Sequence, residues 1–527
     1  MNLKKILCGT LGASLLLSST ACSAAPAQQA APAASAVSQT QAQSQNAAQT
    51  QQAAKSPKYV FLFIGDGMSY PQFQAASDYL GALDDPDYVK ALPSIDYEKR
   101  EGELNGPKRL NFMNFDVAGS AVTYDSCSFA PDSASTATSI ATGHKTYSGM
   151  INMDEGLTRK YESIAEKLHR QKGWKVGIIS SVNLNHATPA AFYAHQASRN
   201  NYYEIGEELV NSGFEYFAGG GLKKSTGPDK DKTSLYDLAT NAGYKVTYTQ
   251  ADAEAVTAAD GKVILIDEHL ADSDAMDYEM DRQDGEWALA DYVKKGIDVL
   301  DNDTGFFMMC EGGKIDWACH ANDAGATVND TLALADAVQV AIDFAKQHAD
   351  ETLILVTGDH ETGGLTIGFA GTDYDTYLDS LASQNISYAQ FDEQYVEKYK
   401  ENHTSFEDAM KDVEKLFGLK LSGDQNDRLV LTDYEVQRLR TAYEFAMTDP
   451  DVDEYTQEQY VLYGTYNPFS VTVTHILNNK AGVDFTSYSH TGLPVAVFAN
   501  GTGEDAFNGY YDNTEIYQKM ASLLEVK

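Results

Sequence analysis

The sequence has few basic residues for its length. Its 527 residues include 39 Lys and Arg against 76 Asp and Glu, which gives a formal net charge of -37. Such a surface repels phosphate backbones and anionic lipid headgroups. This composition argues against a nucleic-acid groove and an anionic membrane surface as partners. Most of these carboxylates are expected to be solvated surface groups.

Cysteine is also scarce, and no C-x-x-C motif is present. Of the five cysteines, Cys8 and Cys22 lie near the N-terminus, which leaves Cys127, Cys310 and Cys319. Three thiols cannot all pair within one chain, so we expect no disulfide framework.

Internal repeats are absent as well. The length favours one large α/β domain with insertions.

The N-terminal region lacks an apolar run long enough to span a membrane. Residues 1–24 combine Lys4 and Lys5 with an apolar stretch over 6–17, followed by small residues. A basic start, a short apolar run and small residues are typical of an export signal. We therefore expect the chain to be exported.

Two processing routes are open for this signal. Ser-Thr-Ala-Cys resembles a bacterial lipoprotein box, which would make Cys22 a lipid anchor on the outer face of the membrane; cleavage after Ala24 or Ala25 would instead give a periplasmic or secreted protein. We favour the lipoprotein. Residues 25–56 are almost only Ala, Gln, Ser and Pro, which predicts a disordered linker.

Four apolar runs in the folded part, residues 57–527, each end in polar side chains. Continuous apolar runs are typical of parallel strands buried on both faces. Helical patterns lie between them, for example over 161–168 and 328–342. This alternation predicts an open α/β sheet, in which sites gather at the carboxyl ends of strands. The runs and the polar residues that follow are 58–64 before Asp66, 174–180 before His186 and Thr188, 305–310 before Glu311, and 352–357 before Asp359 and His360.

Two stretches interrupt this alternation, at about 80–112 and at 371–474. Both are acidic and rich in tyrosine, and the second contains a helical pattern over 433–447. We expect both to be insertions in the single domain 57–527.

Ser133 lies in the stretch A-P-D-S-A-S-T-A-T, where small residues predict the start of a helix. Backbone N–H groups point outward at such a start and favour an anion, so the hydroxyl is well placed for a nucleophile. Pro-Asp-Ser is equally typical of an ordinary N-cap. From this stretch alone both interpretations stay open.

The segment E-G-G-K-I-D-W-A-C-H carries three metal-type ligands. If a helix starts after the glycines, Asp316 and His320 lie four residues apart on one face and can bind one metal ion. Glu311 is then left for another ion. Imidazole and carboxylate ligands without thiolate suit catalytic zinc, and the surplus of hard oxygens suits magnesium.

Two further stretches add imidazoles. Asp359 and His360 are adjacent, so their side chains diverge at a strand end and suit a wall between two metals. His490 comes shortly before a last strand expected over 494–498. Each of these residues alone would more often be structural, and only their combination predicts a metal centre.

Eight motifs occur in order between Phe61 and Asn500, and together they identify the sequence as similar to the alkaline phosphatase family. This resemblance implies a three-layer α/β sandwich around a large, mostly parallel central sheet. It also implies hydrolysis of phosphate monoesters through a phosphoserine intermediate, with release of inorganic phosphate. The motifs are F-I-G-D-G-M, P-D-S-A-S-T-A-T, T-G-x-K-T, H-A-T-P-A, H-Q-A-S-R, E-G-G-K-I-D-W-A-x-H, T-G-D-H-E-T-G-G and S-H-T-G.

The resemblance also implies roles for single residues. Ser133 would be phosphorylated, and Arg199 would clamp two phosphate oxygens with its planar fork. Because no His–Asp pair of triad type is evident, zinc is the expected activator of the serine. The implied sites are one zinc on Asp316, His320 and His490, a second zinc on Asp66, Asp359, His360 and Ser133, and a magnesium on Asp66, Thr188 and Glu311.

Two positions depart from the best-known bacterial pattern. His186 and Trp317 stand where many relatives carry Asp and Lys. The imidazole would bind either the third metal or, through water, the phosphate. The indole would remove an ammonium from the pocket, so product phosphate should be held less tightly. The identity of the third metal is therefore open.

Two alternatives to a phosphomonoesterase stay open. One is a phosphodiesterase of the same superfamily, since the 371–474 stretch could narrow the site toward diesters. The other is an exported non-catalytic protein that binds phosphate or metal, against which stands the joint presence of every expected ligand with Ser133 and Arg199. A sulfatase is disfavoured because the C/S-x-P-x-R motif is missing. Relatives of this kind are often homodimers, and both homodimer and monomer are open here.

Overall fold

The structure, a computed structural model, describes residues 56–85, 87–88, 98, 102–424 and 426–527. These residues belong to one unit, Ala53–Lys527. The expected export signal with Cys22, and all of the expected linker except residue 56, lie outside the described residues. No helix in the described ranges is both long and apolar enough to cross a bilayer.

A ten-stranded sheet runs through this unit in the order β14-β2-β13-β8-β1-β7-β3-β4-β6-β5. From β8 to β5 all neighbouring strands are parallel. β13 is antiparallel to both of its neighbours, and β14 is parallel to β2. The strands are β1 Tyr59–Gly65, β2 Val117–Val122, β3 Lys175–Ser180, β4 Tyr216–Gly219, β5 Lys245–Thr247, β6 Val263–Ile266, β7 Phe306–Gly312, β8 Thr352–Gly358, β13 Val495–Gly501 and β14 Tyr510–Asp512.

Helices cover both faces of the sheet, and strand β1 shows why. Its side chains alternate between two cores, with Phe61 and Phe63 on one face and Leu62 and Ile64 on the other, all fully buried. The result is the predicted three-layer α/β architecture. The first face packs against α1 Tyr70–Asp84, α8 Leu289–Leu300, α9 Lys314–His320 and α10 Ala324–Ala345, and the second against α2 Ser133–Thr142, α3 Ile164–Lys172, α5 Tyr202–Ser212, α6 Leu235–Asn241 and α17 Thr514–Leu523.

The four strands predicted from apolar runs are β1, β3, β7 and β8, and they lie next to one another in the sheet. Their ends coincide, because Gly65 of β1 pairs with Gly312 of β7 and with Gly358 of β8. Glu311 pairs in turn with Ser180 at the end of β3. The register therefore places every ligand that follows these strands at one edge of the sheet.

The helices differ from their sequence patterns mainly at the ends. The pattern over 161–168 becomes α3, which starts only at Ile164 because Ser163 and Glu166 form a capping box there. The pattern over 328–342 lies within α10, and that over 433–447 corresponds to α14, Asp433–Ala446. Two short helices complete the sheet region: α4 Ala187–Ala190 and α7 Gln250–Glu254.

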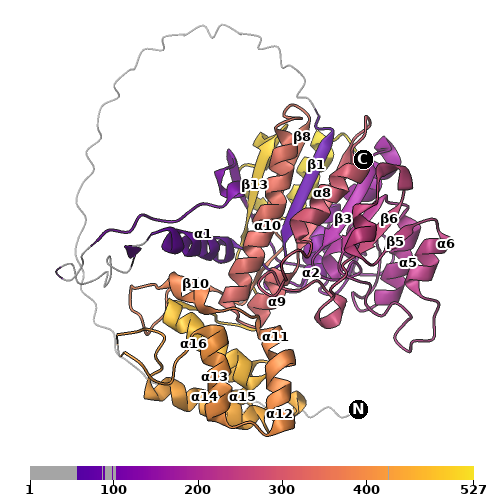
Figure 1. Ribbon diagram of the computed structural model, residues 1–527. Coiled ribbons are helices and arrows are strands. Elements are labelled where there is room, and N and C mark those ends of the chain that lie inside the picture. Colours follow the sequence, from indigo (N-terminus) through magenta and orange to yellow (C-terminus); the bar gives the residue numbers. More distant parts are fainter. Residues whose placement is uncertain (1–55, 86, 89–97, 99–101, 425) are drawn as a thin grey trace, which may run out of the picture. The chain divides into compact units, whose positions relative to one another are not determined.

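A helical segment lies between two short paired strands, β10 Thr366–Ile367 and β11 Val483–Asp484. It extends beyond the expected end at 474, since its last helix runs to Ala481. We call residues 368–482 the helical segment. Figure 1 shows its helices gathered beside one end of α10. They are α11 Tyr388–Phe391, α12 Glu397–Asn402, α13 Phe406–Phe417, α14, α15 Gln457–Tyr463 and α16 Pro468–Ala481.

Candidate active site

Ser133 is the first residue of helix α2. The preceding Asp132 caps this helix, since its Oδ1 accepts the backbone N–H of Ser135 at 3.1 Å. The capping role in Pro-Asp-Ser thus belongs to the aspartate, and the serine hydroxyl is not used for it. Ser133 is 1% exposed, and its Oγ lies 3.1 Å from Nε2 of His360. The hydroxyl therefore faces the imidazole from the start of a helix.

His360 directs one ring nitrogen at several oxygen atoms. Its Nε2 lies 3.2 Å from Oδ1 of Asp66 and 3.4 Å from Oδ2 of Asp359, in addition to the Ser133 hydroxyl. Nδ1 lies 3.2 Å from Oγ1 of Thr362, whose own proton is donated elsewhere, so Nδ1 donates to it. In the neutral ring Nε2 then carries a lone pair toward two carboxylates. That arrangement fits a metal cation held by Asp66, Asp359 and His360.

A second pair of imidazoles meets in the same way. Nδ1 of His320 donates to the carbonyl of Tyr488 at 2.6 Å, and Nδ1 of His490 donates to the carbonyl of Pro131 at 2.6 Å. The two Nε2 atoms are left without protons when the rings are neutral, and they lie 3.1 Å apart. Asp316 oxygens lie 3.4 Å and 3.6 Å from them. Facing lone pairs beside a carboxylate repel one another unless a cation lies between them.

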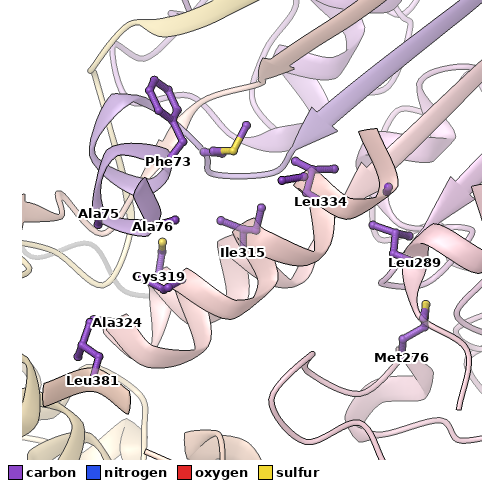
Figure 2. Close-up of a cluster of buried hydrophobic side chains, with 14 of the residues drawn as sticks. Phe73, Ala75, Ala76, Met276, Leu289, Ile315, Cys319, Ala324, Leu334 and Leu381 are labelled. Carbon is purple, nitrogen blue, oxygen red and sulfur yellow. The ribbon is translucent and has the colours of Figure 1, made fainter. Parts of the chain in front are cut away.

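Helix α9 explains how Asp316 and His320 reach this position. Figure 2 shows Ile315 and Cys319 of α9 in the buried apolar cluster that also contains Ala76 of α1. Burial of that face turns Asp316 and His320, which lie four residues apart, toward the sheet edge. The helix starts directly after the two glycines, as the sequence predicts.

A third group of ligand atoms belongs to Asp66, Glu311 and His186, which lie within 4.8 Å of one another. Their polar atoms are buried and lack hydrogen-bond partners among the described residues, namely both Asp66 oxygens, Oε1 of Glu311 and Nδ1 of His186. Oγ1 of Thr188 is likewise unpartnered. A buried polar atom without a partner is costly, so these atoms fit the binding of a cation. Of the two partners expected for His186, this position fits the third metal.

The carboxylates of these groups repel one another. Burial raises the pKa of Asp66 well above its usual range, and the charges of Asp359 and Asp316 raise it further. Burial also raises the pKa of Asp359, and that of Glu311 to about 8. Asp316 differs, because three imidazoles outweigh its burial and lower its pKa. The raised pKa values mean that Asp66, Asp359 and Glu311 hold a proton more readily than usual. Bound cations would relieve the repulsion among these three carboxylates.

Arg199 lies beside the serine through an interaction that the sequence did not predict. Its Nη1 donates to Oδ2 of Asp132 at 2.9 Å, and Nη2 lies 3.4 Å from Nε2 of His186. Burial opposes ionisation of Asp132, but the guanidinium outweighs it and lowers the pKa of that carboxyl. Burial, reinforced by Arg199, lowers the pKa of His186 to about 3. The same Asp132 thus caps the serine's helix and fixes the arginine.

Trp317 stands where many relatives carry Lys, and the ammonium of another residue lies beside its indole. Nζ of Lys314 lies 4.7 Å from the centre of the indole ring and 4.1 Å from the ring of Tyr278. Its carboxylate partner is Asp272, at 3.1 Å. Lys314 is fully buried and is not among the residues that line the cavity, although its partner Asp272 is. That Trp317 keeps an ammonium out of the pocket stays a prediction.

A cavity of about 410 Å³ opens at these groups. It brings together Ser133, Arg199, His186, Trp317, Asp316, His320 and His490. Four further residues line it that no sequence motif predicts: Asp272, Ser273, Tyr388 and Tyr466. The two tyrosines come from the helical segment, far along the chain. All twelve predicted site residues thus gather around one sheet edge.

A family model described as alkaline phosphatase matches residues 57–526. The chain belongs to the alkaline phosphatase family. It is therefore a metal-dependent enzyme that hydrolyses phosphate esters of small molecules, in keeping with the three groups of ligand atoms at the sheet edge.

Relatives and solved structures agree with this membership. Alkaline phosphatase 3 of Bacillus subtilis is 31% identical over 75% of this chain and 77% of its own length. Alkaline phosphatase 4 of the same species is 28% identical, with 86% of both chains covered. The structure of a cold-active alkaline phosphatase from the psychrophile Shewanella sp. matches with a TM-score of 0.69 and 27% identity, covering 88% of this chain and 99% of that chain. The Thermus thermophilus alkaline phosphatase, 22% identical with a TM-score of 0.70, shares the fold over 90% of this chain and 92% of that chain.

Proposed function

We propose that this phosphatase works by double displacement, with Ser133 as the residue that is phosphorylated. The observation that carries this proposal is the position of its Oγ, 3.1 Å from His360 Nε2 at the point where Asp66 and Asp359 converge. A serine hydroxyl is a poor nucleophile unless a neighbouring group activates it. No other described side chain near Ser133 supplies an imidazole–carboxylate pair separate from these ligands.

The three groups of ligand atoms would hold two zinc ions and one magnesium ion. One zinc would lie between Asp316, His320 and His490, and the second between Asp66, Asp359, His360 and Ser133. The magnesium would be bound by Asp66, Glu311 and Thr188, with His186 as an additional ligand. Such metal ions, when bound, act as Lewis acids on the entering and leaving oxygens of phosphoryl transfer.

The chain's own residues carry the first displacement. Oγ of Ser133 forms a bond to phosphorus while the bond from phosphorus to the alcohol oxygen breaks, so the alcohol leaves from the opposite side. The outward N–H groups at the start of α2 and the guanidinium of Arg199 lie where negative charge must be held. When no substrate is bound, the ion pair with Asp132 holds the Arg199 guanidinium in place.

The second displacement releases phosphate. Water attacks the phosphorus of phosphoserine, the Ser133 Oγ–P bond breaks, and inorganic phosphate leaves. Arg199 retains the phosphoryl group through both steps because its fork matches two oxygens at once. His186 would then decide how firmly the third cation is held, and Trp317 would keep the Lys314 charge from direct contact with the product.

The place of action also remains a proposal. We expect the chain to be exported, and to be anchored by Cys22 on the outer face of a bacterial membrane in preference to being released into the periplasm or secreted. Phosphomonoesters of small molecules are the expected substrates. Gel filtration of the exported form would distinguish a homodimer from a monomer, and mass spectrometry of its N-terminus would distinguish lipidation from ordinary cleavage.

Replacement of Ser133 by alanine tests the proposal. Ser133→Ala is expected to keep its bound zinc, measured by elemental analysis, and to lose nearly all turnover, because the covalent route is removed. Ser139→Ala is the matched control: this serine lies in the same helix, is equally buried, and its hydroxyl bonds only to the backbone of Ser135. An unchanged rate in Ser133→Ala would remove the nucleophile assignment.

A diester comparison tests the choice of substrate class. Wild-type enzyme is expected to hydrolyse p-nitrophenyl phosphate faster than bis-p-nitrophenyl phosphate, since a monoester offers three unesterified oxygens to Arg199 and the metal-type ligands in the cavity, whereas a diester offers only two. A preference for the diester would replace phosphomonoesterase by phosphodiesterase. Retained zinc with no turnover of either ester would favour a non-catalytic binding protein.

A further inference from the structure

The cavity lining contains two unlike sets of side chains. One set is Ser133, Arg199 and the metal-type ligands. The other is the aromatic rings of Trp317, Tyr388 and Tyr466, of which Trp317 and Tyr388 pack against the same apolar cluster and Tyr388 packs against Tyr466. We call these three rings the aromatic wall. They come from two parts of the chain, Trp317 from α9 and the tyrosines from the helical segment. A phosphate bound by the first set must direct its alcohol toward the remaining space, which the aromatic wall borders.

The rings of the aromatic wall are held in place by their surroundings. Tyr388 accepts a hydrogen bond from the hydroxyl of Tyr278 at 3.3 Å, and its backbone N–H donates to Asp323 at 2.9 Å. Tyr466 packs nearly perpendicular to Tyr388, with ring centres 5.5 Å apart. These contacts position the two rings without any ligand. Fixed rings lose little entropy when a ligand stacks on them.

The Tyr466 hydroxyl makes no hydrogen bond among the described residues. Its ring packs near those of Tyr388, at 5.5 Å, and Tyr488, at 6.1 Å, and against the apolar cluster of Ala442, Tyr463 and Val471. It is partly exposed to the cavity and is not needed for a hydrogen bond. What this residue offers to a ligand is therefore its ring.

Charge in the cavity is already compensated. The carboxylates that line it are Asp272, which pairs with Lys314 at 3.1 Å, and Asp316, which faces the imidazoles. No uncompensated carboxylate among these lining residues is left for a cationic alcohol. The free surface of the aromatic wall is thus neutral.

We propose that the aromatic wall binds the leaving alcohol, and that the preferred substrates are phosphomonoesters whose alcohol carries a planar aromatic ring. An aryl group and a nucleobase share this chemistry, since both present a flat π-face to Trp317, Tyr388 or Tyr466. The inference rests on the proposed function, because it needs phosphate at Ser133 and Arg199. It adds the class of alcohol that the site selects.

The proposed order of steps predicts which rate constant responds. The alcohol leaves in the first displacement, when phosphoserine forms. Contacts to its ring therefore stabilise the transition state measured by kcat/KM, whereas hydrolysis of phosphoserine is the same for every ester. A ring preference should appear in kcat/KM and be absent from kcat when the second displacement is the slower step.

The test compares four esters whose alcohols differ in ring and charge. Benzyl phosphate and cyclohexylmethyl phosphate have leaving groups of similar size and basicity but differ in a flat ring. Adenosine 5′-monophosphate presents a nucleobase, and phosphocholine presents an ammonium without a ring. Wild-type kcat/KM is expected to be higher for benzyl than for cyclohexylmethyl phosphate by about twofold to tenfold.

Variants of Tyr466 separate the ring from its bulk and its hydroxyl. Tyr466→Leu is expected to abolish most of the benzyl preference, and Tyr466→Phe to preserve it. Tyr388→Leu gives a second, independent measurement if either protein folds poorly. Tyr460→Leu is the matched control, because Tyr460 lies in the same helical segment but is 50% exposed and does not line the cavity.

Each outcome decides the inference. A preference shared by adenosine 5′-monophosphate extends it to nucleobases, and one confined to benzyl phosphate assigns aryl esters. Equal kcat/KM for benzyl and cyclohexylmethyl phosphate, or an unchanged preference in Tyr466→Leu, overturns it. Phosphocholine as the best substrate overturns it in favour of an ammonium site. Failure of all four esters would instead refute the proposed function, which Ser133→Ala tests separately.

Discussion

Two histidines in this molecule each face two carboxylates, yet the clusters differ in kind. His360 directs the single atom Nε2 at both Asp66 and Asp359. His195 instead gives each ring nitrogen its own carboxylate, with Nδ1 3.2 Å from Glu208 and Nε2 3.4 Å from Glu166.

The number of ring nitrogens used decides what each cluster needs. A doubly protonated imidazole satisfies the two glutamates at His195, and their hydrogen bonds outweigh burial and raise its pKa to about 9. One nitrogen cannot serve two carboxylates and a hydroxyl in the same way. The His360 cluster is left incomplete without a cation, whereas the His195 cluster is complete. Convergence on one atom, more than residue type, therefore distinguishes a metal site from a structural ion pair.

The largest effect is expected from His360→Gln. The substitution removes a ligand where phosphoryl transfer takes place, so kcat/KM should fall by about a thousandfold or more. His195→Gln is the comparison and should retain turnover, because its cluster lies outside the cavity. Steady-state kinetics on p-nitrophenyl phosphate with parallel zinc analysis measures both. Comparable losses in the two variants would mean that the distinction between the clusters is wrong.

Metal removal is expected to act on the His360 cluster and to leave the His195 cluster unchanged. Loss of divalent ions leaves Asp66, Asp359 and Glu311 facing one another, and binding at a thousand times Kd contributes about 4 kcal/mol to stability. Chelation should therefore lower the melting temperature and abolish activity, with both restored by zinc and magnesium. The effect of His195→Gln on melting should be the same before and after chelation, since distant sites add. If chelation strongly changed the effect of His195→Gln on the melting temperature, the His195 and His360 clusters would not be independent, and the distinction between them would be wrong.

The smallest effect expected is the pH dependence of the stability that the His195 cluster contributes. The folded pKa of His195, about 9, lies above its ordinary value of 6.5. Its contribution to stability is therefore fully present below about pH 6.5 and is lost as pH rises through about 9. His195→Gln should lower the free energy of unfolding by up to about 3 kcal/mol at pH 6 and by much less at pH 10.

Urea unfolding at both pH values measures this difference. His269→Gln is the control, because its ring is half exposed and lies 3.6 Å from the single carboxylate of Glu286. A pH-independent loss in His195→Gln would show that the imidazole is held for its shape rather than its charge.

Much of the fold and of the metal-type ligands could be predicted from sequence, because each signal was local. Four apolar runs ending in polar residues gave four adjacent strands, and the spacing of Asp316 and His320 gave one face of α9. Local patterns work here because parallel strands end together, so residues that follow them must meet.

The remaining features depend on contacts between distant segments. Pro-Asp-Ser gave no means to decide which residue caps α2, since that depends on the backbone angles of Asp132. The carboxylate that pairs with the Lys314 ammonium beside Trp317 comes from Asp272, which lies 42 residues earlier in the chain. Tyr388 and Tyr466 reach the cavity through the packing of the helical segment, for which no motif exists. Such proximity is set by tertiary packing and leaves no periodic pattern in the chain.

The division of the cavity between two parts of the chain has an evolutionary consequence. The residues for phosphate are fixed by strand register, and a shift of one position in β1, β7 or β8 would displace several ligands at once. The two tyrosines belong to a segment whose base is closed by the short strands β10 and β11. The helical segment can therefore change in evolution, and with it the preferred alcohol of the substrate, while the residues that bind the phosphate stay in place.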